Sequence, residues 1–149
     1  MSGYSIVSAL ALMCYVLLFS VIFASKKDKC LSAFLHILAV LILWTGGSLL
    51  MRVQAFPGIA FWYNVSLTGI WLSCFTLIRF MRVLAGKRFS LLDTILLGLT
   101  VALLAVNAFT GWFLAPPDPV TENGRLIFVY ETTVGTVIMY LFMAFVAVV

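Results

Sequence analysis

Long apolar runs with very few charged residues constrain the fold of this chain more than any motif does. Five of them cover residues 4–25, 31–51, 59–78, 91–114 and 126–149, separated by short polar breaks. A helix needs about 20 apolar residues to cross the hydrocarbon core of a bilayer. Hydrophobic residues make up 64% of the chain and charged residues 9%, too much apolar surface for a small soluble domain to bury. The sequence therefore predicts an all-α, polytopic membrane bundle of five transmembrane helices, a single domain over residues 1–149.

Basic residues are distributed unevenly between the breaks. If the N-terminus lies outside, only Arg52 and Arg125 flank the outer ends of the runs. The seven that flank the inner ends are Lys26, Lys27, Lys29, Arg79, Arg82, Lys87 and Arg88. Short loops rich in Lys and Arg stay on the cytoplasmic side, so we expect the N-terminus outside and the C-terminus in the cytoplasm. The formal charge of +4 then reflects orientation in the lipid bilayer, and no nucleic-acid partner is expected.

The break between the second and third runs predicts a tight outer hairpin. It covers residues 52–58 and contains Pro57 and Gly58. Proline disfavours helix at the residue before it, and glycine accepts turn conformations, so the two runs are expected to be antiparallel neighbours. Residues 46–48, Gly-Gly-Ser, lie near the end of the second run, where small side chains let membrane helices approach closely.

The other two long breaks differ from each other in composition. Residues 115–125 contain three prolines and a Glu-Asn-Gly turn, which predicts a stiff outer loop. Residues 79–90 are basic and are expected to prolong the third helix beyond the membrane, against anionic lipid headgroups.

Residues with catalytic or metal-binding chemistry are few. Cys14, Cys30 and Cys74 form no Cys-x-x-Cys pair, which favours free thiols packed as small apolar groups. His36 is the single histidine and is expected to form a hydrogen bond between helices, the alternative being a proton-sensing role. No nucleophile with a base, carboxylate pair or phosphate loop is present in the sequence. We therefore expect no catalytic residue, no metal and no cofactor in these residues.

Polar side chains inside the apolar runs are the most informative candidates, because lipid makes them costly. Glu131 is expected either to pair with Arg52 or Arg125 at the interface or to line an outward-facing pocket. Asn107 is expected either to bond a neighbouring helix or to form a pocket wall. Asp93 begins the fourth run and is expected to face the positive end of its helix dipole.

Tryptophans around the outer hairpin carry a family resemblance. A Leu-Trp pair late in the second run, a short hairpin and a Phe-Trp pair opening the third resemble the N-terminal seven-helix sensor region of bacterial histidine kinases, also found before diguanylate cyclases. The matching residues are Leu43, Trp44, Phe61, Trp62, Asn107 and the stretch 124–130. The resemblance implies a multi-pass protein of the bacterial cytoplasmic (inner) membrane, a homodimer, and an output domain that is a kinase or cyclase.

The end of the sequence agrees with that resemblance. Its last residues, MYLFMAFVAVV, stop inside an apolar run without a polar anchor. We therefore expect the chain to be a fragment of a longer protein, with two more helices and the cytoplasmic output domain following residue 149.

Three functions are consistent with these features. The first is a sensory input module whose outer pocket binds a small amphiphilic or apolar signal. The pocket is expected to be bounded by Trp44, Arg52, Trp62, Asn107, Trp112 and Glu131. The second is a non-catalytic five-helix scaffold subunit of a membrane complex, held by small-residue faces at residues 46–48 and at Gly98, Ala102 and Ala105. The third is a small transporter, for which broken helices or mid-membrane charges would be expected.

Overall fold

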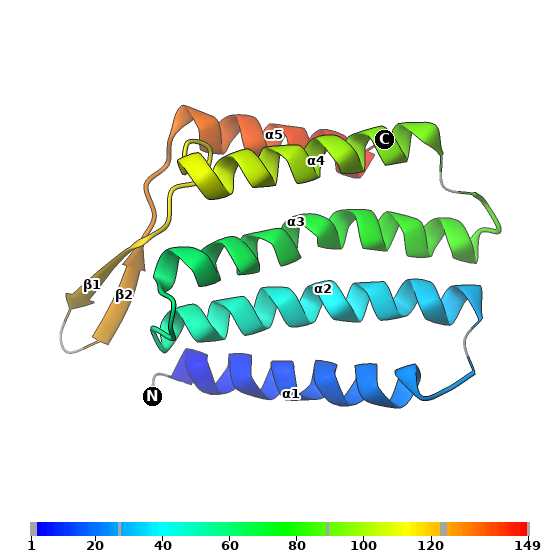
Figure 1. Cartoon of the computed structure of the whole chain (residues 1–149), viewed down its shortest axis with the longest axis horizontal. Helices are drawn as coiled ribbons and strands as arrows, with labels where there is room; N and C mark the ends of the chain where they lie inside the picture. The colour runs from blue at the N-terminus through cyan, green and yellow to red at the C-terminus, as the bar shows by residue number, and fades with distance from the viewer. Residues whose placement is uncertain (1–2, 27, 89, 123–124, 149) are drawn as a thin grey trace.

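The computed structural model describes residues 3–26, 28–88, 90–122 and 125–148. In that part of the chain, antiparallel helices lie side by side and a β-hairpin projects from one end (Figure 1). The helices are α1 (Gly3–Phe23), α2 (Lys29–Arg52), α3 (Ile59–Leu84), α4 (Leu91–Thr110) and α5 (Val134–Val148). The strands β1 (Asp118–Glu122) and β2 (Arg125–Val129) pair antiparallel, with Asp118 opposite Val129.

Four of the helices, α1 to α4, are long and apolar enough to cross a membrane. This supports the prediction of a helical membrane bundle. The 18 residues that form the most apolar window of α1 include none that is buried, and α1 packs mainly on α2. A helix that is apolar all round and covered on one side only is suited to lipid as its solvent.

The ends of α3 and α4 differ from the predicted spans for local reasons. The helix α3 continues past residue 78 to Leu84, as expected for a basic extension beyond the membrane. The helix α4 ends at Thr110 and not at residue 114, because Gly111 adopts a left-handed conformation with φ of 63° and its N–H bonds the Asn107 carbonyl. Glycine is the residue that takes this C-terminal position without steric cost.

The fifth run was predicted to be helical from residue 126, and this is wrong. Residues 125–129 form β2, and α5 begins only at Val134. The sequence between the paired Glu122 and Arg125 is Asn-Gly, the dipeptide most typical of two-residue hairpins. Branched and aromatic residues follow it in the sequence Arg-Leu-Ile-Phe-Val, and these favour an extended strand.

The start of α5 is fixed by two threonines. The Thr136 N–H donates to Thr133 Oγ1 at 3.2 Å, and the Thr133 N–H donates to Thr136 Oγ1 at 3.1 Å. This reciprocal pair satisfies backbone donors that a helix N-terminus leaves open. The helix therefore begins after Thr133, and Glu131 lies in the link between β2 and α5 instead of inside a helix.

The packing of α2 on α3 is the most extensive helix contact, and two glycines make it possible. A Cβ at Gly47 would lie 2.6 Å from the Ser66 backbone N. A Cβ at Gly69 would lie 2.7 Å from the Val40 carbonyl oxygen. Ser66 Oγ also donates to the Trp44 carbonyl across this interface, at 3.1 Å. The close approach predicted from residues 46–48 is confirmed at Gly47, and Gly69 is its partner on α3.

The hairpin between α2 and α3 is as short as predicted. Gly58 has φ of 147°, a conformation that glycine adopts more readily than other residues. The Trp62 indole N–H donates to the carbonyl oxygens of Ala55 and Phe56, at 3.1 and 3.2 Å. The first turn of α3 thereby holds the hairpin backbone in place.

The two ends of the bundle carry different connections between the helices (Figure 1). The links α1–α2 and α3–α4 lie at one end, called here the basic end, with Arg82 and Lys87 among its residues. The α2–α3 hairpin and the β-hairpin lie at the opposite end, called here the hairpin end. Lys27, one of the basic residues predicted to flank an inner end, lies outside the described residues.

At the basic end, Asp93 occupies the first turn of α4, as predicted. Ser90 Oγ accepts from the Asp93 N–H at 3.2 Å, and the Ser90 N–H donates to Asp93 Oδ2 at 2.7 Å, which completes a capping box. Arg82 pairs with the same carboxylate at 3.1 Å. His36 does not form the predicted bond between helices: its Nδ1 lies 2.6 Å from the Ser32 carbonyl oxygen of its own helix.

We predict that Gly69→Ala destabilises the protein and that Gly98→Ala does not. The added methyl at position 69 meets the backbone of α2, so we expect a loss of about 2 kcal/mol in unfolding free energy. Nothing lies within 4 Å of a Cβ at Gly98, so alanine there should be neutral or stabilising by up to about 1 kcal/mol. Thermal unfolding in detergent compares the two variants. Equal stability would show that the α2–α3 contact does not depend on its glycine.

Candidate functional site

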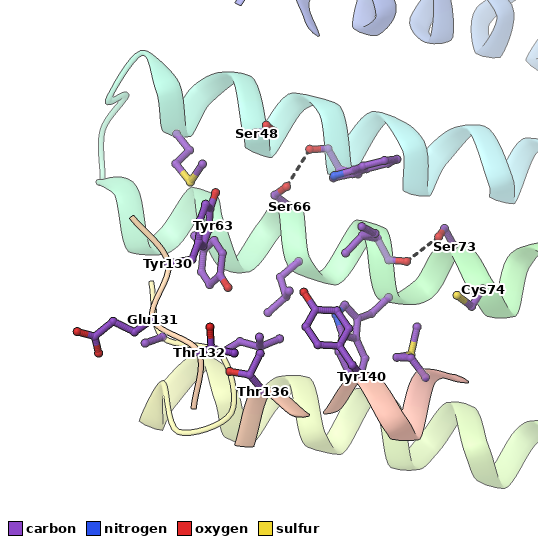
Figure 2. Close-up of a pocket in the computed structure, with 18 residues that line it drawn as sticks. Ser48, Tyr63, Ser66, Ser73, Cys74, Tyr130, Glu131, Thr132, Thr136 and Tyr140 are labelled. Atoms are coloured by element: carbon purple, nitrogen blue, oxygen red, sulfur yellow. Dashed lines mark hydrogen bonds between the residues drawn. The ribbon is translucent and has the colours of Figure 1, made fainter. Parts of the chain in front are cut away.

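A cavity of about 530 Å³ opens between α2, α3 and α5, in the half of the bundle nearer the hairpin end. Figure 2 shows side chains of these helices and of the link between β2 and α5 around it. Its polar wall consists of Ser48, Tyr63, Ser66, Ser73, Cys74, Tyr130, Glu131, Thr132, Thr136 and Tyr140. Its apolar wall includes Met51, Leu67, Trp71 and Met143. The cavity therefore combines aromatic and aliphatic surface with many hydroxyl groups.

Three tyrosines from different segments meet at this cavity. Tyr63 of α3 is buried, and its ring centroid lies 6.3 Å from that of Tyr130, which follows β2. Tyr140 comes from α5 and lines the same space. Aromatic rings at these distances pack favourably, and each phenol carries one polar group. The result is an apolar surface with hydroxyls placed at its rim.

The hydroxyls of the cavity fall into two groups. Ser66, Ser73 and Thr136 each donate to a backbone carbonyl, at 3.1, 2.6 and 2.9 Å. The hydroxyls of Tyr63 and Tyr140 form no hydrogen bond with other residues that the structure describes. These phenols are therefore among the groups that can bond a bound molecule without breaking an existing contact.

Two of the six residues proposed from the sequence line this cavity, namely Trp44 and Glu131. Trp44 is 39% exposed and lies on the wall formed by α2. Glu131 lies at the edge, and its carboxylate points away from the other side chains (Figure 2). Trp71, which also lines the cavity, is 3% exposed.

The other four proposed residues lie elsewhere. Trp62 holds the α2–α3 hairpin through its indole N–H. Arg52 ends α2 and is half-buried. Trp112 is 66% exposed and contacts the Phe113 ring edge-on, with centroids 4.8 Å apart. None of these three is among the cavity's described lining residues.

Asn107, the fourth, is buried and ties down the chain that follows α4. Its Oδ1 accepts from the N–H groups of Phe113 and Leu114, at 3.1 and 2.8 Å, and its Nδ2 donates to the Leu114 carbonyl at 3.1 Å. Of the two roles expected for Asn107, the structure agrees better with the structural one. Its partner, however, is the turn that follows its own helix and not a neighbouring helix. Non-helical backbone buried in a membrane protein needs such partners, because lipid offers none.

The same turn is held from the side of α5 by residues that sequence reasoning missed. The hydroxyls of Thr133 and Thr136 donate to the Phe113 carbonyl, at 3.3 and 2.9 Å. A Cβ at Gly135 would lie 2.7 Å from the Trp112 carbonyl oxygen, so only glycine fits there. We call Asn107, Thr133, Thr136 and the backbone of Phe113 and Leu114 the polar knot. The motif Thr-x-Gly-Thr was its only sequence signal.

Within the described part of the chain, ligands for a metal do not gather. No group of three or more His, Cys, Asp or Glu side chains lies close enough to hold an ion. Cys14, Cys30 and Cys74 are free thiols. The chemical groups that the cavity offers are therefore its aromatic rings, its aliphatic side chains and its hydroxyls.

We predict that Asn107→Leu lowers the unfolding free energy by about 2–4 kcal/mol. The variant leaves two buried N–H groups without an acceptor, at about 1–3 kcal/mol each. Asn64→Leu is the matched control, because Asn64 donates only to the Ala60 carbonyl of its own helix, and its effect should stay within about 0.5 kcal/mol. Thermal unfolding measures both. Equal stability of the two variants would contradict the assignment of the polar knot.

Comparison of the chain with protein-family models, with curated proteins and with solved structures found no match. Its function is therefore inferred from the geometry and chemistry of its own residues.

Proposed function

We propose that this chain is a membrane-embedded sensory input module that binds a small amphiphilic or apolar signal in the cavity between α2, α3 and α5. The cavity is the observation that carries the proposal. Its volume of about 530 Å³ falls in the range of about 300–1,000 Å³ that is typical of small-molecule sites. The phenols of Tyr63 and Tyr140 would bond the polar part of the ligand, and the apolar wall would cover the rest.

The packing of the helices supports a role in transmitting a signal. The helices α1, α2 and α3 form one well-packed layer, and α5 rests on α3 through a much smaller contact. A ligand between α3 and α5 would favour one separation of these helices over another. Such a shift requires that the ligand bind the two arrangements with different affinity. Because α3 runs unbroken from Tyr63 to Leu84, a change at the cavity would reach the basic end.

We further propose that the hairpin end faces outward and that the basic end faces the cytoplasm of a bacterium. In this arrangement α5 is the fifth helix that crosses the membrane. The charge asymmetry of the loops supports this orientation. The signal would then enter from the outer side. The change in helix arrangement would pass from the basic end to a cytoplasmic output domain such as a histidine kinase or a cyclase. The resemblance of the hairpin tryptophans to histidine-kinase sensor regions favours the same assignment.

One observation favours the scaffold as a second candidate. Gly98, Ala102 and Ala105 form an exposed face on α4, whereas Gly47 is occupied by α3 and Gly46 faces Leu12 of α1. Membrane helices associate through faces of this kind. A scaffold subunit would use this face to hold a partner helix and would bind no ligand in the cavity.

We predict that small amphiphiles stabilise the wild-type protein through the cavity. Thermal unfolding in detergent is measured with a set of alkylphenols and fatty alcohols. A ligand at 100 times its dissociation constant raises the unfolding free energy by about 2.7 kcal/mol. Tyr140→Phe removes one hydrogen bond and should weaken binding about fivefold. Tyr15→Phe makes the same change on α1, away from the cavity, and should leave affinity unchanged.

Two results would count against the sensor. If no amphiphile stabilises the wild type, or if Tyr140→Phe and Tyr15→Phe bind each compound equally, the cavity is not a ligand site. Loss of a co-purifying membrane protein in Gly98→Leu, with no ligand bound by the wild type, would favour the scaffold.

The proposed orientation has its own test. In a background in which Cys14, Cys30 and Cys74 are replaced by serine, single cysteines are placed at Asp118 in β1 and Lys87 in the α3–α4 link, both exposed. A maleimide that cannot cross the membrane should label position 118 in intact cells and position 87 only after permeabilisation. Labelling of both positions in intact cells would contradict the orientation.

A further inference from the structure

Two hollows at the basic end of the bundle share the side chain of Arg79. The outer one has a volume of about 460 Å³ and is lined by Asp28, Lys29, Ser32, Arg79 and Val83. The deeper one, of about 480 Å³, is lined mostly by apolar groups of α2 and α3, with His36 and Arg79 near its polar end and Leu97 of α4 at its flank. Because Arg79 lines both, the two hollows adjoin.

The lining residues of the two adjoining hollows follow one face of α2 and one face of α3, and we treat the hollows as one groove. On α2 they are residues 29, 32, 36, 39 and 40, and on α3 they are residues 72, 75, 76, 79 and 83. Steps of three or four residues keep a side chain on one face of a helix. From residue 29 to residue 40 the groove extends about 16 Å at about 1.5 Å per residue. This matches half of a hydrocarbon core about 30 Å thick. We call it the α2–α3 groove.

Charge and apolar surface are separated along the α2–α3 groove. Lys29 and Arg79 lie at its mouth, and Val40, Leu72 and Phe75 lie deeper. One carboxylate, that of Asp28, is also at the mouth, where it accepts a hydrogen bond from the Leu31 N–H at 2.6 Å. The local balance therefore remains positive.

Neither cation at the mouth forms an ion pair with another described residue. The ion pair that the structure gives at this end joins Arg82 to Asp93, and Arg79 is exposed beside it. A basic side chain at a membrane surface without a carboxylate partner attracts anionic headgroups.

We propose that the α2–α3 groove is a binding site for an anionic phospholipid. The lipid phosphate would lie between Arg79 and Lys29, with the Ser32 hydroxyl nearby, and one acyl chain would follow the apolar floor between α2 and α3. A phosphate alone would match the mouth and leave the floor uncovered, and a neutral apolar chain would leave both cations unused. An anionic lipid satisfies both parts with one molecule of the required length. The mouth of the groove lies at the opposite end of the bundle from the hairpin end, and none of the residues that line the groove lines the cavity proposed for the signal.

The test compares lipids that share acyl chains and differ in headgroup charge. The full chain is purified in detergent, incubated with phosphatidylglycerol or phosphatidylcholine, and examined by native mass spectrometry for retained lipid. We expect wild type to retain phosphatidylglycerol preferentially. Arg79→Gln should weaken that retention about fivefold, as for one lost headgroup contact, and Arg79→Lys should preserve most of it. Arg88→Gln is the matched control, because it removes the same charge from an exposed residue at the same end that does not line the groove. The difference between the two variants therefore reports the groove and not the general attraction of basic residues for anionic headgroups.

A second variant tests the apolar part without changing charge. Ala39→Phe places a ring on the groove floor and should reduce retention of phosphatidylglycerol while Arg88→Gln retains it. Thermal unfolding without lipid checks that each variant is folded. Glycerol 3-phosphate, a soluble organic phosphate without acyl chains, should not displace the bound lipid.

Three outcomes would overturn the proposal. Equal retention of phosphatidylglycerol by Arg79→Gln and Arg88→Gln would show that Arg79 does not bind the lipid phosphate. Unchanged retention by Ala39→Phe would show that no acyl chain lies on the groove floor. Displacement of the lipid by glycerol 3-phosphate would show that the mouth is a site for soluble anions.

Discussion

The close approach of α2 and α3 at Gly47 and Gly69 is the contact on which the rest of the bundle depends. Lipid is as apolar as leucine, so helices in a bilayer gain little by hiding side chains from it and associate through close packing instead. Here two backbones meet without intervening side chains, and the Ser66 hydroxyl adds a hydrogen bond between them. The helix α1 packs on the outer side of this pair, and α4 and α5 rest on α3.

A second constraint decides the shape of the hairpin end. The chain between α4 and β1 is irregular, and its backbone groups must find partners inside the protein. Asn107 supplies them from one side, and Thr133 and Thr136 from the other. The polar knot therefore holds the start of α5 beside the end of α4. Because α5 begins late, the link before it passes Tyr130 and Glu131 over the space beside α3, and the cavity results.

Much of the fold could be predicted from the sequence, since lipid imposes length and polarity on each span. The four long helices, the Pro57-Gly58 hairpin, the extension of α3 and the place of Asp93 in the first turn of α4 follow from local composition. Residues 126–133 were wrongly predicted as helix, because apolarity alone does not distinguish the strand at residues 126–129 from a helix. The Asn-Gly dipeptide before them was the local signal for a hairpin.

The site was much less predictable. Trp62 and Asn107 were sensible candidates, because buried polar groups in a membrane need partners, but the sequence does not show whether the partner is a ligand or the chain's own backbone. Tyr63 and Tyr140 meet only because α5 starts at Val134 and lies against α3. The sequence alone determined that four of these helices are long and apolar enough to cross a membrane, since hydropathy acts residue by residue. The tertiary structure decided which faces meet, because packing depends on residues that are far apart in the chain.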